Sequence, residues 1–149
     1  MLVSAPLGAQ DPVVAAPDVD ALFHSKDKKL DRNKQAAYHI EKDLLEANHW
    51  DEANKWLTDR YIQHNPNAKS GLAGVVKYFS ARKPTPVPEH LGAKVTFVTA
   101  EGDYVTVGTV RAMKDKSGEP YTTTWFDTWR FVDGKADEHW DCAEKFGRP

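Results

Sequence analysis

Residues 121–143, YTTTWFDTWRFVDGKADEHWDCA, decide the fold of this chain. The first half of the stretch is rich in Thr, Trp and Phe, which suit a pleated, half-buried strand. The pair Asp133-Gly134 is a strong hairpin turn signal, so the stretch predicts two long antiparallel strands. Two carboxylates, Asp127 and Asp141, stand where a purely structural strand would carry apolar residues.

The length of the turn decides which side chains share a face. A two-residue Asp-Gly loop pairs Val132 with Lys135 and places Asp127 on the same face as Trp140. A three-residue loop, closed by a left-handed glycine, pairs Phe131 with that lysine instead, and a one-residue slip reverses every facing. We favour the three-residue loop because it gathers the acids and the histidine on one face, made of Trp125, Asp127, Trp129, Phe131, Asp137, His139 and Asp141. The opposite face then carries Phe126, Arg130, Glu138 and Trp140.

Both faces of the predicted hairpin carry aromatic residues, so we expect that neither is simply exposed to water. A carboxylate on a covered face is costly unless it is paired, hydrogen-bonded or protonated. Two interpretations follow. Asp127 and Asp141 either lie near strand ends and cap neighbouring backbone amides, or they line a pocket and act as acid or base.

Composition excludes several classes of function. A chain of 149 residues is most simply one domain with its own core. The formal net charge of −2 and the lack of a long basic run give no electrostatic case for a nucleic-acid partner. No apolar run approaches the length of a membrane span. The single cysteine, Cys142, cannot form an intrachain disulfide.

The first 20 residues differ from the rest of the chain. They are small, apolar and proline-bearing, without periodicity, and we interpret residues 1–20 as a flexible arm or the remnant of a signal segment before a domain at 21–149. The run up to Ala9-Gln10 resembles the end of a secretory signal, but a positive start and a full apolar stretch are missing. Localisation therefore stays open between an exported and a cytoplasmic protein.

Helical periodicity predicts three helices ahead of the strands. The first covers residues 31–49, with Asp31 as N-cap and Ala37, Ile40 and Leu44 in its inward stripe. We assign its charged residues, Glu41 among them, mostly to the other face. The second helix covers residues 50–57, and the third covers 70–81 with Ser70 as a possible cap.

Strand patterns fill the remainder of the chain. Residues 58–67 form a short extended segment stopped by Pro66. Tyr61, His64 and Asn65 there can donate or accept hydrogen bonds, although Asn-Pro-Asn is also ordinary turn chemistry. Alternating patterns predict further strands at 94–100 and 104–113. Helices followed by a run of strands indicate an α+β fold, with helices on one face of a curved, mostly antiparallel sheet.

Residues 59–66, 127–135 and 138–141, with the turn at 100–103, resemble the SnoaL-like polyketide cyclases of the NTF2-like superfamily. The resemblance covers residues 35–143. It implies a cone-shaped barrel with a deep pocket between helices and sheet, a homodimer through the outer sheet face, and chemistry without cofactor or metal. In the cyclases, a strand aspartate that corresponds to Asp141 acts as acid or base in an aldol closure. Asp127 stands where the founding cyclase has a histidine, and His64 or Asn65 where the cyclases place an asparagine.

The first functional hypothesis is an enzyme of the aldol cyclase, isomerase or lyase type that acts on an apolar, carbonyl-bearing molecule. Asp141 removes a proton next to the carbonyl, and Asp127 pairs with it or tunes it. His64, Asn65 or Tyr61 stabilises the enolate oxygen. The remaining substrate-binding candidates on the same surfaces are Trp125, Trp129 and His139.

Two further hypotheses stand beside the enzyme. The pocket of a non-catalytic binding module would hold an apolar ligand and perform no chemistry, and such a pocket does not need the two aspartates. A metal site could draw on His64, His139, Asp127 and Asp141, which are permissible ligand types. No short motif with metal-ligand spacing is present, so we predict neither a metal nor a cofactor.

Overall fold

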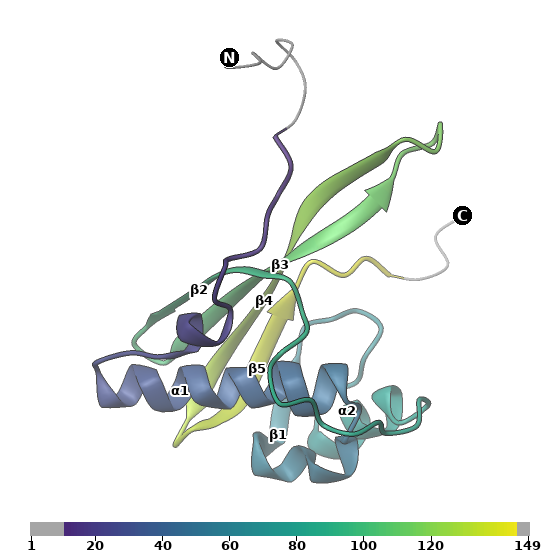
Figure 1. The fold of residues 1–149 in the computed structure, drawn as a ribbon. Helices are drawn as coiled ribbons and strands as arrows, with labels where there is room; N and C mark the ends of the chain where they lie inside the picture. Colours follow the sequence, from purple (N-terminus) through teal and green to yellow (C-terminus); the bar gives the residue numbers. More distant parts are fainter. Residues whose placement is uncertain (1–10, 146–149) are drawn as a thin grey trace.

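The computed structural model describes residues 11–145 and has the predicted α+β architecture, with helices on one face of a five-stranded sheet (Figure 1). The end of the predicted signal remnant, at Ala9-Gln10, lies outside the described residues. Within the segment before the first helix, the Ala16 N–H donates to the carbonyl oxygen of Val95 at 2.8 Å. Part of the predicted arm is therefore hydrogen-bonded along the edge of the sheet.

The longest helical segment combines α1 (Lys28–His39) with the π-helical turn η2 (Ile40–Glu46). It begins earlier than predicted because Asp27, in extended conformation, accepts hydrogen bonds from the N–H groups of Lys29 and Leu30, both at 2.9 Å. Asp31, the predicted cap, instead accepts from the backbone N–H of Ser25 at 2.8 Å. The prediction of Asp31 as the cap was wrong.

Three short helical elements complete the helical layer: η1 (Asp20–Phe23), η3 (Trp50–Lys55) and α2 (Leu72–Phe79). Element α2 is shorter than the predicted helix at 70–81, and its N-cap is Gly71 with φ 88°. Ser70, the predicted cap, accepts a hydrogen bond from the Gln63 backbone N–H at 3.0 Å. That bond ties the start of α2 to the end of the first strand.

The sheet contains β1 (Leu57–Gln63), β2 (Val95–Glu101), β3 (Tyr104–Lys114), β4 (Pro120–Val132) and β5 (Lys135–Asp141). Its order is β1-β5-β4-β3-β2, with β1 parallel to β5 and the other neighbours antiparallel. Strands β1 and β2 form its two edges and do not pair with each other. The sheet is therefore not closed into the expected barrel. The mostly antiparallel arrangement is as predicted.

The turn between β4 and β5 differs from the favoured prediction. Val132 pairs with Lys135, and positive φ at both intervening residues defines a two-residue turn. A bulge then makes Asp137 an extra residue, because Phe131 pairs with Ala136 while Arg130 pairs with Glu138. The shorter turn moves the β5 side chains to the opposite faces, and the bulge moves those from Glu138 onwards back again. The pocket face therefore carries Asp127, Trp129, His139 and Asp141, as predicted, whereas Asp137 instead bonds Arg130.

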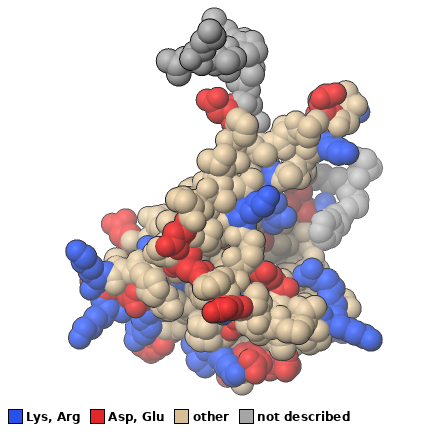
Figure 2. Space-filling model, in the orientation of Figure 1, with Lys and Arg blue, Asp and Glu red and all other residues tan. Residues whose placement is uncertain are grey.

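A hydrophobic core joins the helices to the sheet. Ala37, Ile40 and Leu44 pack against the strands, where Val107 and Trp129 are almost fully buried. Each such large side chain contributes roughly 1.5–3 kcal/mol when it leaves water. Figure 2 shows Lys, Arg, Asp and Glu interspersed over the face that it presents. Among the described residues, no helix combines the length and apolar character needed to cross a bilayer.

Candidate active site

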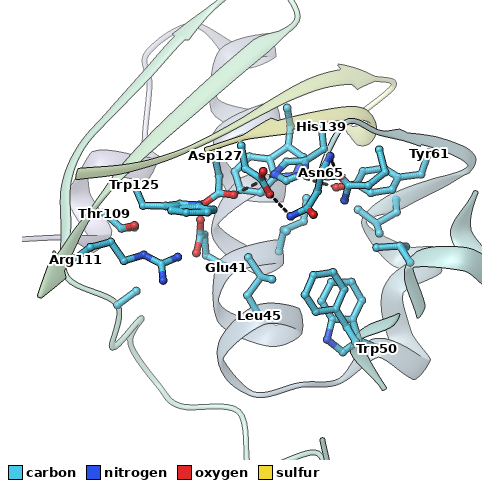
Figure 3. Close-up of a pocket in the computed structure, with 18 of the residues that line it drawn as sticks. Glu41, Leu45, Trp50, Tyr61, Asn65, Thr109, Arg111, Trp125, Asp127 and His139 are labelled. Carbon is cyan, nitrogen blue, oxygen red and sulfur yellow. Dashed lines mark hydrogen bonds and ion pairs between the residues drawn. The ribbon is translucent and has the colours of Figure 1, made fainter. Parts of the chain in front are cut away.

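A cavity of about 510 Å³ lies between the helical layer and the inner face of the sheet. This volume is typical of small-molecule sites. Its walls are largely apolar on the helix side, where Leu45, Trp50, Val75 and Phe79 line it. Polar side chains from the strands form the opposite wall (Figure 3).

The cavity brings together seven of the eight residues that the sequence singles out. The side chains of Asp127 and His139 are almost fully buried, and Tyr61 and Trp129 are buried with them. The seven that line the cavity are Tyr61, Asn65, Trp125, Asp127, Trp129, His139 and Asp141.

His64 is the residue that the structure does not bring to the cavity. Side chains of an extended segment alternate between faces, and Tyr61, Gln63 and Asn65 line the cavity. His64 therefore projects to the outer face, where its Nε2 lies 2.9 Å from Glu138 Oε1 and its ring stacks on Trp140. The predicted role of His64 in the pocket is corrected on this ground.

Asp141 is held by two N–H donors. Asn65 Nδ2 donates to Oδ2 at 2.7 Å, and the Ala143 backbone N–H donates to Oδ1 at 2.9 Å. The Asn65 amide is itself oriented, because its oxygen accepts the Asn67 N–H at 2.9 Å. Asp141 thus has the environment of an oriented carboxylate at the polar wall.

Asp127 and His139 form a pair with a defined hydrogen count. Gln63 Oε1 accepts the Asn65 backbone N–H at 3.0 Å and lies 2.7 Å from His139 Nδ1. A carbonyl oxygen only accepts, so Nδ1 must carry a hydrogen. The other ring nitrogen, Nε2, lies 3.0 Å from Asp127 Oδ1. A neutral imidazole with its hydrogen on Nδ1 has none on Nε2, and a bare Nε2 cannot bond a bare carboxylate oxygen. We infer that one further proton lies between Nε2 and Asp127.

Tyr61 supplies a hydroxyl group at the same wall. Its oxygen accepts the Trp129 indole N–H at 3.1 Å, and burial raises the pKa of Tyr61 above its usual value. The phenol stays protonated as a result. Within the described part of the chain, the hydroxyl hydrogen of Tyr61 bonds no acceptor, so this hydroxyl can donate to a bound molecule.

Sequence reasoning missed four charged residues of the cavity: Glu41, Arg82, Lys94 and Arg111. Glu41 on η2 and Arg111 on β3 are the two that its own periodicities could have found. Both had a signal. Glu41 lies four residues after Ala37 and three before Leu44, which are buried members of the predicted inward stripe. Arg111 lies four residues after Val107, so strand alternation places it on the inner face with that buried residue. Its guanidinium lies over the Trp125 ring, 4.4 Å from the centroid.

The same residues could also reach a metal ion. Asp127, His139 and Asp141 each offer one ligand atom, and these atoms lie within 4.8 Å of one another. Two carboxylates and an imidazole are permissible ligands for several divalent metals. His64, the fourth ligand considered from the sequence, bonds Glu138 on the outer face instead.

A SnoaL-like domain model matches residues 38–139, more than half of the chain. The chain therefore belongs to the SnoaL-like domain family. The match begins in α1 and ends in β5, so it spans the helices and strands that enclose the cavity. A comparison with curated proteins finds no match.

Solved structures share the fold at low sequence identity. A SnoaL-like protein from Jannaschia sp. CCS1, solved as a candidate polyketide cyclase, superposes with a TM-score of 0.55 and 16% identity, covering 80% of this chain and 91% of that chain. TerC, co-crystallised with polyporic acid, gives 0.52 and 18%, with coverage of 76% and 92%. An epoxide hydrolase of the LEH-like type from M. tuberculosis gives 0.52 and 14%, with coverage of 74% and 80%. At these identities the likeness establishes the NTF2-like fold.

Proposed function

We propose that this protein is an enzyme that removes a proton next to the carbonyl group of an apolar small molecule, in a reaction of the aldol cyclase, isomerase or lyase type. One observation carries the proposal. An oriented carboxylate, Asp141, stands beside the hydrogen-bonded pair of Asp127 and His139, in a cavity whose helix-side wall is largely apolar. Base and acid thus occupy one site, with their ligand atoms within 4.8 Å of one another.

In the proposed step, an Asp141 oxygen takes the proton from the carbon beside the carbonyl group. The electron pair of that C–H bond forms the C=C bond of an enolate, and the carbonyl π electrons move to oxygen. Tyr61 O–H donates a hydrogen bond to that oxygen, in place of the His64 considered from the sequence. Proton transfer of this kind contributes roughly 10²–10⁴-fold to a rate.

The Asp127–His139 pair completes the cycle in this proposal. Its extra proton passes to the enolate oxygen, or to an oxygen formed when a second carbonyl is attacked. Asp141 then returns its own proton to the pair or to product. Asp127 therefore acts through His139 at 3.0 Å and does not act only by tuning Asp141.

The known relatives support a small-molecule substrate. Similar folds serve a candidate polyketide cyclase, a protein crystallised with polyporic acid, and an epoxide hydrolase. These differ in reaction, and one fold hosts many functions, so the reaction class is argued from the side chains of this site.

A passive binding module is the alternative. It is favoured by one observation, that both oxygens of Asp141 already accept hydrogen bonds from Asn65 and Ala143. Each carboxylate oxygen has a second acceptor position, however, so a base role remains geometrically open.

Deuterium exchange into 2-tetralone, an enolisable bicyclic ketone, separates the two. We expect wild-type protein to accelerate exchange beside the carbonyl, and Asp141→Asn to lose roughly 10²–10⁴-fold of that acceleration while its melting temperature stays equal or rises. The control is Glu138→Gln on the outer face of the same strand. Exchange that survives in Asp141→Asn would rule out Asp141 as the base.

We also propose that the protein is a homodimer through the outer face of the sheet. Phe97, Tyr104 and Phe126 are exposed there, and Phe97 and Phe126 lie with ring centroids 6.0 Å apart. Sedimentation at the mass of two chains, shifted towards one chain by Phe126→Glu, supports this assembly. Sedimentation of wild-type protein at the mass of one chain contradicts it.

A further inference from the structure

The proposed chemistry leaves Glu41 without a role, although its carboxyl group lines the same cavity. Glu41 belongs to η2, a π-helical turn, and the residue is 6% exposed. Figure 3 shows it pointing from the helix towards Asp127 and Trp125 on the strands. A glutamate so deeply buried is rare unless it is paired.

Glu41 is not paired in this way. Within residues 11–145, its Oε1 is buried and has no hydrogen-bond partner. An unsatisfied buried polar atom costs free energy, so its retention calls for an explanation such as a ligand contact. Burial, followed by the negative charge of Asp127, raises the pKa of Glu41 to about 8. The carboxyl group is therefore neutral at neutral pH and can donate a hydrogen bond.

The charged groups around Glu41 come from three elements. Asp127 on β4 and Glu46 on η2 oppose its ionisation, while the positive charge of Arg111 on β3 favours it. Arg111 is stacked over Trp125 at 4.4 Å and has five N–H donors. Figure 3 places Glu41 and Arg111 on the side of the cavity away from Tyr61.

We propose that Glu41 and Arg111 together bind an oxygen anion of the substrate, so that the enzyme takes carbonyl compounds that also carry a carboxylate. This rests on the proposed function, since it assumes that the cavity holds the substrate. A neutral carboxyl donor and a guanidinium both favour a negatively charged oxygen. Asp141 and Tyr61 remain free to act on the carbonyl at the other side, so the two sites fix the orientation of the molecule.

The test uses two probes of similar shape, naphthalene-2-carboxylate and 2-methylnaphthalene, with binding followed by quenching of Trp fluorescence. We expect wild-type protein to bind the carboxylate about tenfold more tightly than the hydrocarbon. Arg111→Met and Glu41→Leu should each abolish most of that preference and leave hydrocarbon binding within about threefold of wild type. Glu41→Gln keeps an N–H donor and should keep the preference. Exposed Glu119→Gln is the matched control.

The outcomes separate this inference from the proposed function. A carboxylate preference that persists in Asp141→Asn, together with its loss in Glu41→Leu, supports the inference whatever happens to exchange into 2-tetralone. Equal binding of both probes by wild-type protein overturns it. An unchanged preference in Glu41→Leu, or an equal loss of both probes, also overturns it, because Glu41 would then act only through the shape of the cavity.

Discussion

On each face of the β4–β5 hairpin a carboxylate of the hairpin pairs with a histidine, and the two distances are almost equal. His139 Nε2 lies 3.0 Å from Asp127 on the inner face, and His64 Nε2 lies 2.9 Å from Glu138 on the outer face. The histidine side chain is 8% exposed in the inner pair and 45% exposed in the outer pair. The two histidine–carboxylate pairs therefore stand in opposite environments.

Their neighbours differ as much as their exposure. Glu138 accepts a second bond from Arg130 at 3.1 Å, and hydrogen bonding to His64 lowers the pKa of Glu138. The inner histidine is fixed by the neutral Gln63 amide instead. The exposed pair, whose carboxylate also bonds an arginine, therefore stabilises the surface of the sheet. No arginine that the structure describes bonds the carboxylate of the buried pair, so that pair can hold a proton and pass it to a bound molecule.

The largest predicted effect separates the two histidines. His139→Gln should reduce deuterium exchange into 2-tetralone by roughly 10²-fold or more, because the proton-holding pair is lost. His64→Gln should change the rate by less than about threefold, since its ring lies on the outer face. Initial rates by NMR at neutral pH measure both, and an equal loss in the two variants would break the comparison.

The second prediction concerns the pH dependence of stability. The pKa of Glu41 is about 8 in the folded chain, against an ordinary value of 4.5. The unfolded chain releases this proton first, so its contribution to stability is complete below about pH 4.5 and is lost as pH rises to about 8. At about 1.4 kcal/mol per pKa unit the loss between these two pH values should be roughly 4 kcal/mol, and it should be absent from Glu41→Gln. Urea unfolding at the two pH values measures it, and parallel curves for wild type and variant would contradict it.

The smallest predicted effect lies on the outer face. Asp137 accepts hydrogen bonds from Arg60 and Arg130, and the Arg60 bond lowers the pKa of Asp137 well below its usual range. Asp137→Asn should cost about 1–3 kcal/mol of unfolding free energy, because two arginines lose a charged acceptor. Exchange into 2-tetralone should be unchanged. A variant that unfolds as wild type does but loses exchange would reverse the assignment of the two faces.

Much of the fold could be predicted from local patterns. Helical spacing located the long helix, and alternation located the strands and the α+β class. The turn length was wrong, yet the facing of Asp127 and Asp141 was right. The bulge at Asp137 compensates for the shorter turn, and a bulge in the middle of a strand has no reliable sequence signal.

The candidate site was predictable where strand parity was applied and wrong where it was not. Tyr61 and Asn65 share a face four residues apart, so parity excludes the intervening His64 from that face. Glu41 was missed because a charged residue in a helical pattern is usually assigned to the solvent face. Its spacing from Ala37 and Leu44 agrees with the buried position that it takes in η2, so the helical period did carry the signal.

The proposed chemistry depends most on the number of hydrogens held by the Asp127–His139 pair. Nitrogen-15 NMR of the His139 ring at neutral pH tests it directly. We predict a hydrogen on Nδ1, bonded to Gln63, and a second hydrogen shared between Nε2 and Asp127. A ring with a bare Nδ1 and its only hydrogen on Nε2 would contradict the account, because the pair would then hold no proton to give.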